Sequence, residues 1–167
     1  MQFFYRVAIK GSTSMQRGMS LIEIREVELR DETVWRELWA GYCDFYGVRI
    51  SPAVTEATWR RLVSPLSTFV GRVARLDGEI VGLSVSIIHE CSWTIASVCY
   101  LEDLFVAPAM RGRGVGRALI EDLVGLARES GWARVYWHTR ADNVVARRLY
   151  DRFGEADGFV RYRLLLD

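Results

Sequence analysis

Hydrophobic and polar positions along this chain follow two periods, one typical of strands and the other typical of helices. Alternation and β-branched runs predict strands over residues 20–27, 69–76, 80–88, 97–106, 135–139 and 159–166. Apolar residues three to four positions apart predict a helix after Asp31 and further helices over residues 51–62, 114–130 and 144–152. Asp77-Gly78 predicts a tight hairpin between two strands, and Gly131 is placed to end the third helix.

The order of these elements is β, α, α, β, β, β, α, β, α, β. Hairpins come first and a βαβ unit follows, so we expect an α/β (α+β) protein with a mixed sheet and helices on both faces. Residues 19–167 are expected to form a single domain, because no linker or repeat interrupts them. Residues 1–18 are expected to be a weakly ordered extension or a start-site artefact, since Met15 and Met19 are alternative starts.

Composition limits the kinds of partner that this chain is expected to bind. Of its 167 residues, 50% are hydrophobic and 26% are charged, as in an ordinary globular protein, and no apolar run is long enough to span a membrane. The formal net charge of +1 argues against a general nucleic-acid binder. That value hides an uneven distribution: residues 1–110 carry −2, residues 111–152 carry +4 and residues 153–167 carry −1. The basic segment is therefore a candidate for binding an anion.

Cysteines and histidines are too few and too widely spaced for a structural zinc site. The cysteines Cys43, Cys91 and Cys99 form no Cys-x-x-Cys pair, and the histidines are His89 and His138. We therefore expect no metal. An odd number of cysteines is typical of free thiols in a reducing compartment, so we expect a cytoplasmic protein.

The clearest chemistry lies in the glycine-rich turn between a strand and the third helix. Backbone N–H groups at the start of a helix lack intrahelical partners, and the helix dipole adds positive potential there. Gly114 and Gly116 allow a phosphate to approach these groups closely. Arg111, Arg113 and Arg117 add positive charge where a pyrophosphate would lie.

Three cofactors bind turns of this kind. A P-loop for magnesium-ATP needs Gly-Lys-Ser/Thr, whereas Arg117 follows Gly116 here. A dinucleotide fold needs a carboxylate at the end of the next strand, but that strand ends in His138-Thr139-Arg140. Coenzyme A is the third candidate.

Two further motifs accompany the Arg-x-x-Gly-x-Gly of residues 111–116. Residues 143–150 read Asn-x-x-Ala-x-x-Leu-Tyr, and residues 101–103 read Leu-Glu-Asp. Together the three motifs resemble the GCN5-related N-acetyltransferase (GNAT) superfamily over residues 100–162. The chain is most similar to the subgroup of the yeast histone and polyamine acetyltransferases, and it is also similar to diamine and thialysine acetyltransferases.

The resemblance implies the GNAT fold and an acyltransferase that moves an acetyl group from acetyl-CoA directly to a primary amine, through a tetrahedral intermediate and without a metal. It implies that the cofactor is bound by Leu104, Phe105, Val106, Arg111, Gly112, Arg113, Gly114, Val115, Gly116, Arg117, Asn143, Ala146 and Tyr150. A backbone amide near Leu104 or Phe105 is the expected donor to the oxyanion.

An ammonium group must lose a proton before it attacks a thioester, and the departing thiolate benefits from receiving one. Glu102 is the candidate base, acting through water, because a carboxylate in an otherwise apolar strand is costly unless it is paired or functional. Glu90 is an alternative base. Tyr150 is the candidate acid, since it matches the tyrosine of the superfamily's helix.

Alternation along the strand separates its side chains into two sets. We expect Leu101, Asp103 and Phe105 on one face and Tyr100, Glu102, Leu104 and Val106 on the other. Asp103 is a candidate for a structural role or for binding a substrate ammonium group.

The expected acceptor is a small amine of the polyamine type or a lysine side chain, because residues 1–110 carry a net charge of −2. Amino acids and drug-like amines are further candidate acceptors. Asp103, Glu90 and Trp93 are the candidate acceptor contacts, and a homodimer is implied only by the superfamily. The alternative is a non-catalytic sensor that binds acyl-CoA. Such a sensor keeps the Arg111–Gly116 loop and loses the acid and base, so Glu102 and Tyr150 favour the enzyme.

Overall fold

The computed structural model describes residues 5–7 and 21–166. Its elements are β1 (Tyr5–Val7), β2 (Ile22–Glu26), α1 (Glu32–Tyr46), α2 (Pro52–Leu62), β3 (Phe69–Leu76), β4 (Glu79–Cys91), β5 (Thr94–Val106), α3 (Val115–Glu129), β6 (Val135–Trp137) and α4 (Val144–Tyr150). Short 3-10 turns precede α1 and α3. The chain forms two compact units, which divide between Trp137 and His138.

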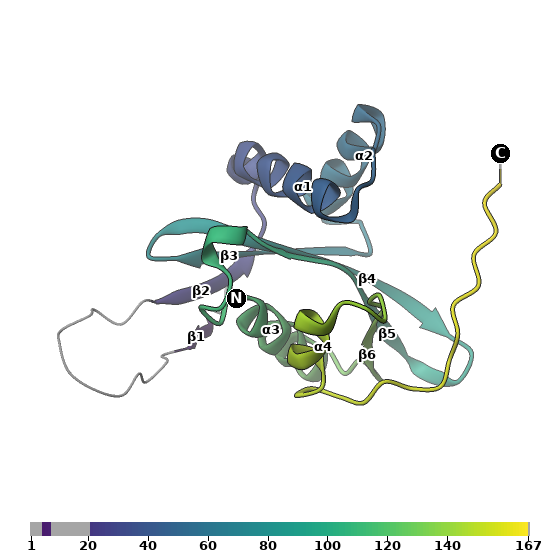
Figure 1. Cartoon of the computed structure of the whole chain (residues 1–167). Coiled ribbons are helices and arrows are strands. Elements are labelled where there is room, and N and C mark those ends of the chain that lie inside the picture. Colours follow the sequence, from purple (N-terminus) through teal and green to yellow (C-terminus); the bar gives the residue numbers. More distant parts are fainter. Residues whose placement is uncertain (1–4, 8–20, 167) are drawn as a thin grey trace, which may run out of the picture. The chain divides into compact units, whose positions relative to one another are not determined.

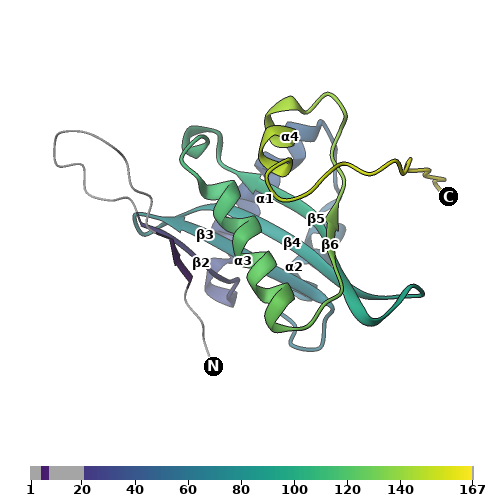
Figure 2. The same ribbon diagram turned by 90° about the horizontal axis from the view of Figure 1, so that it is seen from below.

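The first unit is built on one sheet with the strand order β1-β2-β3-β4-β5-β6. Neighbouring strands are antiparallel as far as β5, and β6 pairs with β5 in parallel. Helices α1 and α2 cover one face of this sheet, and α3 covers the opposite face (Figure 1). Figure 2, seen from below, shows α3 lying over the strands. The expected mixed sheet with helices on both faces is confirmed.

The hairpin between β3 and β4 forms where the sequence predicts it. Asp77 and Gly78 both have positive φ values, 52° and 95°. This is the backbone of a tight turn whose twist matches that of the flanking strands. The next hairpin is longer than predicted, because Cys91 pairs with Thr94 and the expected loop is reduced to Ser92 and Trp93.

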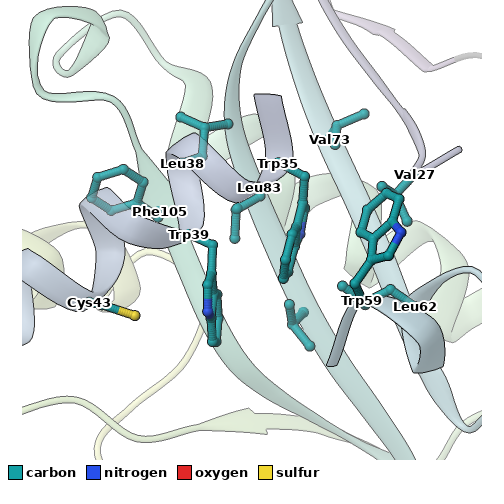
Figure 3. Close-up of a cluster of buried hydrophobic side chains, with 11 residues drawn as sticks. Val27, Trp35, Leu38, Trp39, Cys43, Trp59, Leu62, Val73, Leu83 and Phe105 are labelled. Atoms are coloured by element: carbon teal, nitrogen blue, oxygen red, sulfur yellow. The ribbon is translucent and has the colours of Figure 1, made fainter. Parts of the chain in front are cut away.

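A cluster of aromatic side chains holds α1 against the sheet (Figure 3). The rings of Trp35 and Trp39 are stacked with centroids 5.3 Å apart, and the ring of Trp59 lies 5.3 Å from that of Trp35. Gly41 brings α1 close to β5, since an added Cβ at this position would lie 3.1 Å from the ring of Phe105. The close approach of α1 to β5 determines what surrounds the polar residues of that strand.

The C-terminal strand that alternation predicts over residues 159–166 is absent. These residues are irregular, and their side chains are exposed. A strand is stabilised by the ladder it makes with a neighbour, and no described strand pairs with this segment. Alternation shows that a segment can form a strand, but it does not supply the partner.

Other boundaries also differ from the sequence-based expectation, and β6 ends at Trp137 rather than at residue 139. Helix α4 ends at Tyr150 rather than at Arg152. Strand β1, at Tyr5–Val7, pairs with β2 and was not predicted, because it lies in the stretch expected to be weakly ordered. The rest of residues 1–18 lies outside the described residues. None of the described helices is both long and apolar enough to cross a bilayer.

Candidate active site

The glycine-rich turn places an uncapped helix end after β5. Gly112 and Gly114 have φ values of 75° and 88°, a region that residues with a Cβ rarely adopt. Gly114 is the N-cap of α3, and no side chain caps the helix there. The first helical hydrogen bond runs from the Ala118 amide to the Gly114 carbonyl, at 3.0 Å. The preceding amides lack intrahelical acceptors, so this end of α3 is suited to an anion.

The three arginines of the turn all have contacts within the protein. The Nε atom of Arg111 donates to the Val106 carbonyl at 3.1 Å, and its guanidinium lies over the Phe105 ring at 5.5 Å. Arg113 forms an ion pair with Asp77 at 3.3 Å, and Arg117 forms one with Glu121 at 2.7 Å. The last two pairs are largely exposed, and such pairs are weak, so an anion can compete for both arginines.

A β-bulge at Glu102 changes which side chains share a face of β5. Asp103 is opposite Val85 and Leu101 is opposite Ser86, so Glu102 is an extra residue without a partner in β4. Val85 and Ser86 are consecutive and point to opposite faces, and so do Asp103 and Leu101. The expected grouping of Leu101 with Asp103 is therefore wrong, because one inserted residue reverses the alternation.

One edge of β5 is left without a strand neighbour beside the turn. The parallel ladder with β6 runs from Cys99 to Leu101, where Leu101 is opposite Trp137. Within the unit that ends at Trp137, Leu104–Val106 pair with β4 alone. Apart from the Val106 carbonyl, which accepts a hydrogen bond from Arg111, backbone groups on their other edge can pair with an extended ligand or an oxyanion. These are the positions that the sequence predicts for cofactor contacts.

Asp103 is a buried carboxylate with a phenol as its partner. Its side chain is on the α1 face of the sheet, only 8% of the residue is exposed, and the Tyr42 hydroxyl donates a hydrogen bond to it. Burial raises the pKa of Asp103 to about 6, and the Glu102 carboxylate adds to this, whereas the hydrogen bond acts in the opposite direction. Asp103 is therefore partly protonated in mildly acidic solution.

Tyr42 also belongs to this site, although the sequence pattern does not single it out. Its spacing from Trp39 is helical, and such spacing predicts a core residue. The ring does stack on Trp39, with centroids 5.3 Å apart. Only the fold shows that its hydroxyl reaches Asp103.

The other predicted acceptor contacts lie further along the β4–β5 hairpin. Glu90 is exposed near its tip, and Trp93 is in the turn with 77% of its surface exposed. Ten residues of extended strand separate Trp93 from Asp103, which is roughly 33 Å. Glu102 is exposed on β5, next to Asp103. The structure therefore brings Glu102 and Asp103 together and leaves Trp93 apart.

The second unit carries the remaining predicted residues. Asn143 is the N-cap of α4: its side-chain oxygen accepts a hydrogen bond of 3.3 Å from the Ala146 amide, and its Nδ2 donates to Thr139 at 3.2 Å. Tyr150 is the last residue of α4 and is half-buried. Its carbonyl accepts hydrogen bonds from the Phe153 and Gly154 amides, at 2.8 and 3.2 Å, which end the helix.

The histidines and cysteines show no grouping that would hold a metal. Among the described residues, no three His, Cys, Asp or Glu side chains gather in one place. His89 is hydrogen-bonded to the Tyr136 hydroxyl at 2.8 Å. Cys43 and Cys99 are buried free thiols, and burial raises the pKa of each.

Comparison with known proteins gives a consistent result. The model of the acetyltransferase (GNAT) family matches residues 32–154. The D-amino-acid N-acetyltransferase HPA3 of Saccharomyces cerevisiae is 33% identical over 144 residues, which cover 85% of this chain and 89% of the yeast protein. The N-alpha-acetyltransferase RimI of Mycobacterium tuberculosis is 36% identical over 95 residues, which cover 57% of this chain and 56% of that protein.

Solved structures share the fold. A probable acetyltransferase has a TM-score of 0.76 and 26% identity, over 86% of this chain and 97% of its own. The aminoglycoside acetyltransferase meta-AAC0020 from an uncultured soil sample, in complex with trehalose, has a TM-score of 0.75 and 20% identity, over 87% of this chain and 97% of its own. The second likeness concerns the fold alone.

Proposed function

This chain belongs to the acetyltransferase (GNAT) family, and we propose that it transfers the acetyl group of acetyl-CoA directly to the primary amine of a small cationic acceptor. Acetyl-CoA is the cosubstrate of this family. The observation that carries the proposal is the uncapped N-terminus of α3 after a turn with two left-handed glycines. It follows a strand whose edge is open at Leu104–Val106.

These features fit the two chemically different parts of acetyl-CoA. The amides at the start of α3, with Gly112 and Gly114 before them, would hold the pyrophosphate. The open edge of Leu104–Val106 would pair with the amide groups of the pantetheine arm. The remaining proposed cofactor contacts are Arg111, Arg113, Val115, Gly116, Arg117, Asn143, Ala146 and Tyr150. When bound, acetyl-CoA supplies the activated acetyl thioester.

Residues of the chain would then accept the proton of the amine and donate a proton to the departing thiolate. Glu102, exposed and next to a buried carboxylate, would accept the proton of the acceptor's ammonium group, directly or through water. A backbone amide of Leu104 or Phe105 would stabilise the negative charge that develops on the acetyl oxygen. The Tyr150 hydroxyl would donate a proton to the departing sulfur. A sensor that only binds acyl-CoA would need neither a base nor an acid, so these two residues favour the enzyme.

The charge of the acceptor side supports a cationic amine. Glu102 and Asp103 lie together on β5, and Glu90 is on the same hairpin with Trp93. A polyamine-like molecule or a lysine side chain fits carboxylates, and the yeast relative is named for D-amino acids, so amino acids also need testing. A homodimer and a cytoplasmic location are further proposals that rest on the family and on the odd number of cysteines.

The test is the release of free thiol from acetyl-CoA in the presence of polyamines, D- and L-amino acids, aminoglycosides and histone-tail peptides. Calorimetry with acetyl-CoA alone measures binding independently of turnover. Thiol release that depends on one class of amine supports the transferase. Binding of acetyl-CoA without acetylation of any amine contradicts it and favours the sensor.

A further inference from the structure

The buried aspartates of the described chain differ in their partners. Asp31 accepts two hydrogen bonds from the Arg25 guanidinium, at 2.6 and 2.7 Å. Asp122 accepts two from Arg72, both at 2.8 Å. Buried carboxylates are costly without such counter-charges. Asp103 is buried as they are, but its hydrogen-bond partner is a neutral phenol.

The surroundings of Asp103 increase its need for a cation. Among the described residues, the groups that act on its charge are the Tyr42 hydroxyl and the Glu102 carboxylate. Tyr46 and the Cys43 thiol of α1 also lie near this pair, and neither is a cation. The Arg111 guanidinium is bound over the rings of Phe45 and Phe105, 5.1 and 5.5 Å from their centroids, and donates to the Val106 carbonyl. A second carboxylate beside a buried one is unfavourable until positive charge arrives. An ammonium group of the acceptor would supply that charge.

The Tyr42 ring is held firmly in place. It stacks on Trp39 at 5.3 Å and an interplanar angle of 18°, and it meets the Phe105 ring edge-on at 6.4 Å. The Tyr46 ring lies 4.9 Å away on its other side. Burial, followed by the Asp103 carboxylate, raises the pKa of the Tyr42 hydroxyl, so the phenol stays protonated and acts as a donor.

We propose that Tyr42 is a positioning residue whose hydroxyl orients the Asp103 carboxylate to bind the ammonium group of the acceptor amine. This inference rests on the proposed transferase function and specifies its acceptor site. The bound ammonium then lies beside Glu102, the proposed proton acceptor. Acceptors that are cationic at neutral pH are selected, and Tyr42 affects their binding rather than the binding of acetyl-CoA.

The first test is the pH dependence of kcat/KM for spermidine in the Tyr42→Phe variant, which keeps the ring and removes the hydroxyl. Loss of the hydrogen bond raises the pKa of Asp103 above about 6, so the carboxylate is protonated at a higher pH. We therefore expect KM for spermidine to rise about fivefold at pH 6 and to stay nearly unchanged at pH 8.5. The affinity for acetyl-CoA is expected to stay constant.

Thr55→Val, on α2, is the matched control, because it removes a polar contact to Trp39 of α1, the helix that carries Tyr42. The Trp39 Nε1 atom donates to Thr55 Oγ1 at 3.3 Å. This variant tests whether a small loosening of α1 alters the pH profile. The inference requires the acidic side of the pH profile of kcat/KM, its acid limb, to shift to higher pH in Tyr42→Phe and to stay unchanged in Thr55→Val. A limb that moves equally in both variants, or in neither, overturns it.

Asp103→Asn is the second variant, and it keeps the inference testable if Tyr42→Phe folds poorly. It is expected to raise KM for spermidine at least about tenfold at every pH, with the acid limb lost. If amines are acetylated and this variant behaves as wild type, the inference fails while the transferase stands. If no amine is acetylated but spermidine binds in a manner that needs Asp103, the transferase fails while the ammonium site stands.

Discussion

Arg72 of β3 and Asp122 of α3 form a buried, bidentate ion pair that connects the helix to the sheet. Both side chains are almost fully enclosed, with 11% and 5% of their surfaces exposed. Asp122→Ala leaves the guanidinium buried without a counter-charge, and we expect it to lower the free energy of unfolding by about 3–5 kcal/mol. Urea unfolding at pH 7 measures this value.

The matched control for this ion pair is the double replacement Arg72→Met with Asp122→Leu. It removes both charges together, so its stability is expected to be close to that of the wild type or higher. A double variant as unstable as Asp122→Ala would contradict the role of the unpaired charge.

The buried Asp31 is expected to make a pH-dependent contribution to the stability of the fold. Burial raises the pKa of Asp31, but the hydrogen bond and charge of Arg25 and the Glu28 amide outweigh it, so the folded-state pKa lies below the ordinary value. A lowered pKa stabilises the fold at pH values above the unfolded-state pKa, and this contribution is lost as the pH falls through the folded-state pKa. The stability difference between wild type and Asp31→Asn should therefore shrink between pH 7 and pH 3. Unfolding curves along this pH series test it, with the exposed Asp44 changed to Asn as the control.

Gly114 and Gly131 have similar backbones at opposite ends of α3, with φ values of 88° and 68°. An alanine at either position strains the chain, and we expect each to lower stability by about 1 kcal/mol. Only Gly114→Ala also crowds the amides proposed to hold the pyrophosphate, so it alone should weaken acetyl-CoA binding, by at least about tenfold. Calorimetry on both variants separates strain from binding. Equal affinities of the two variants for acetyl-CoA would contradict the assignment of the pyrophosphate to this turn.

Glu102→Gln tests the proposed base, and Glu90→Gln is its control on the same hairpin. Loss of a general base is expected to reduce kcat by about 100-fold or more at pH 7. The loss should become smaller towards pH 10, because a growing fraction of the amine is then already neutral. Steady-state kinetics with the best amine of the thiol-release panel gives both values. A large effect of Glu90→Gln with a small effect of Glu102→Gln would transfer the role to Glu90.

Tyr150→Phe removes one hydroxyl from the end of α4. If that hydroxyl protonates the departing sulfur, turnover should fall by about 100-fold while the Kd for acetyl-CoA changes less than about twofold. Comparing kcat with the Kd from calorimetry distinguishes an acid from a binding residue. Unchanged turnover would exclude the proposed role.

Local chemistry made much of the site predictable. The turn around Gly114 follows from a requirement for positive φ before a helix, and Asn143 as an N-cap follows from its side chain and position. Alternation placed Asp103 on the face of Phe105, as observed, but its contact with Tyr42 could not be predicted, because that contact depends on a helix about 60 residues away. The bulge at Glu102, which alternation does not reveal, moved Leu101 to the opposite face.

The sequence by itself determined the elements whose stability is local. Asp77 and Gly78 form the hairpin, Gly131 follows α3, and the spacing of Trp35 and Trp39 gives α1 its buried face. The tertiary structure decided which residues meet. It paired Arg72 with Asp122, left Asp103 with a phenol in place of a counter-ion, and left the apolar residues 159–166 without a ladder partner among the described strands. The reason is physical: turns and caps are satisfied within a few residues, whereas burial, ion pairing and strand pairing need a partner from elsewhere in the fold.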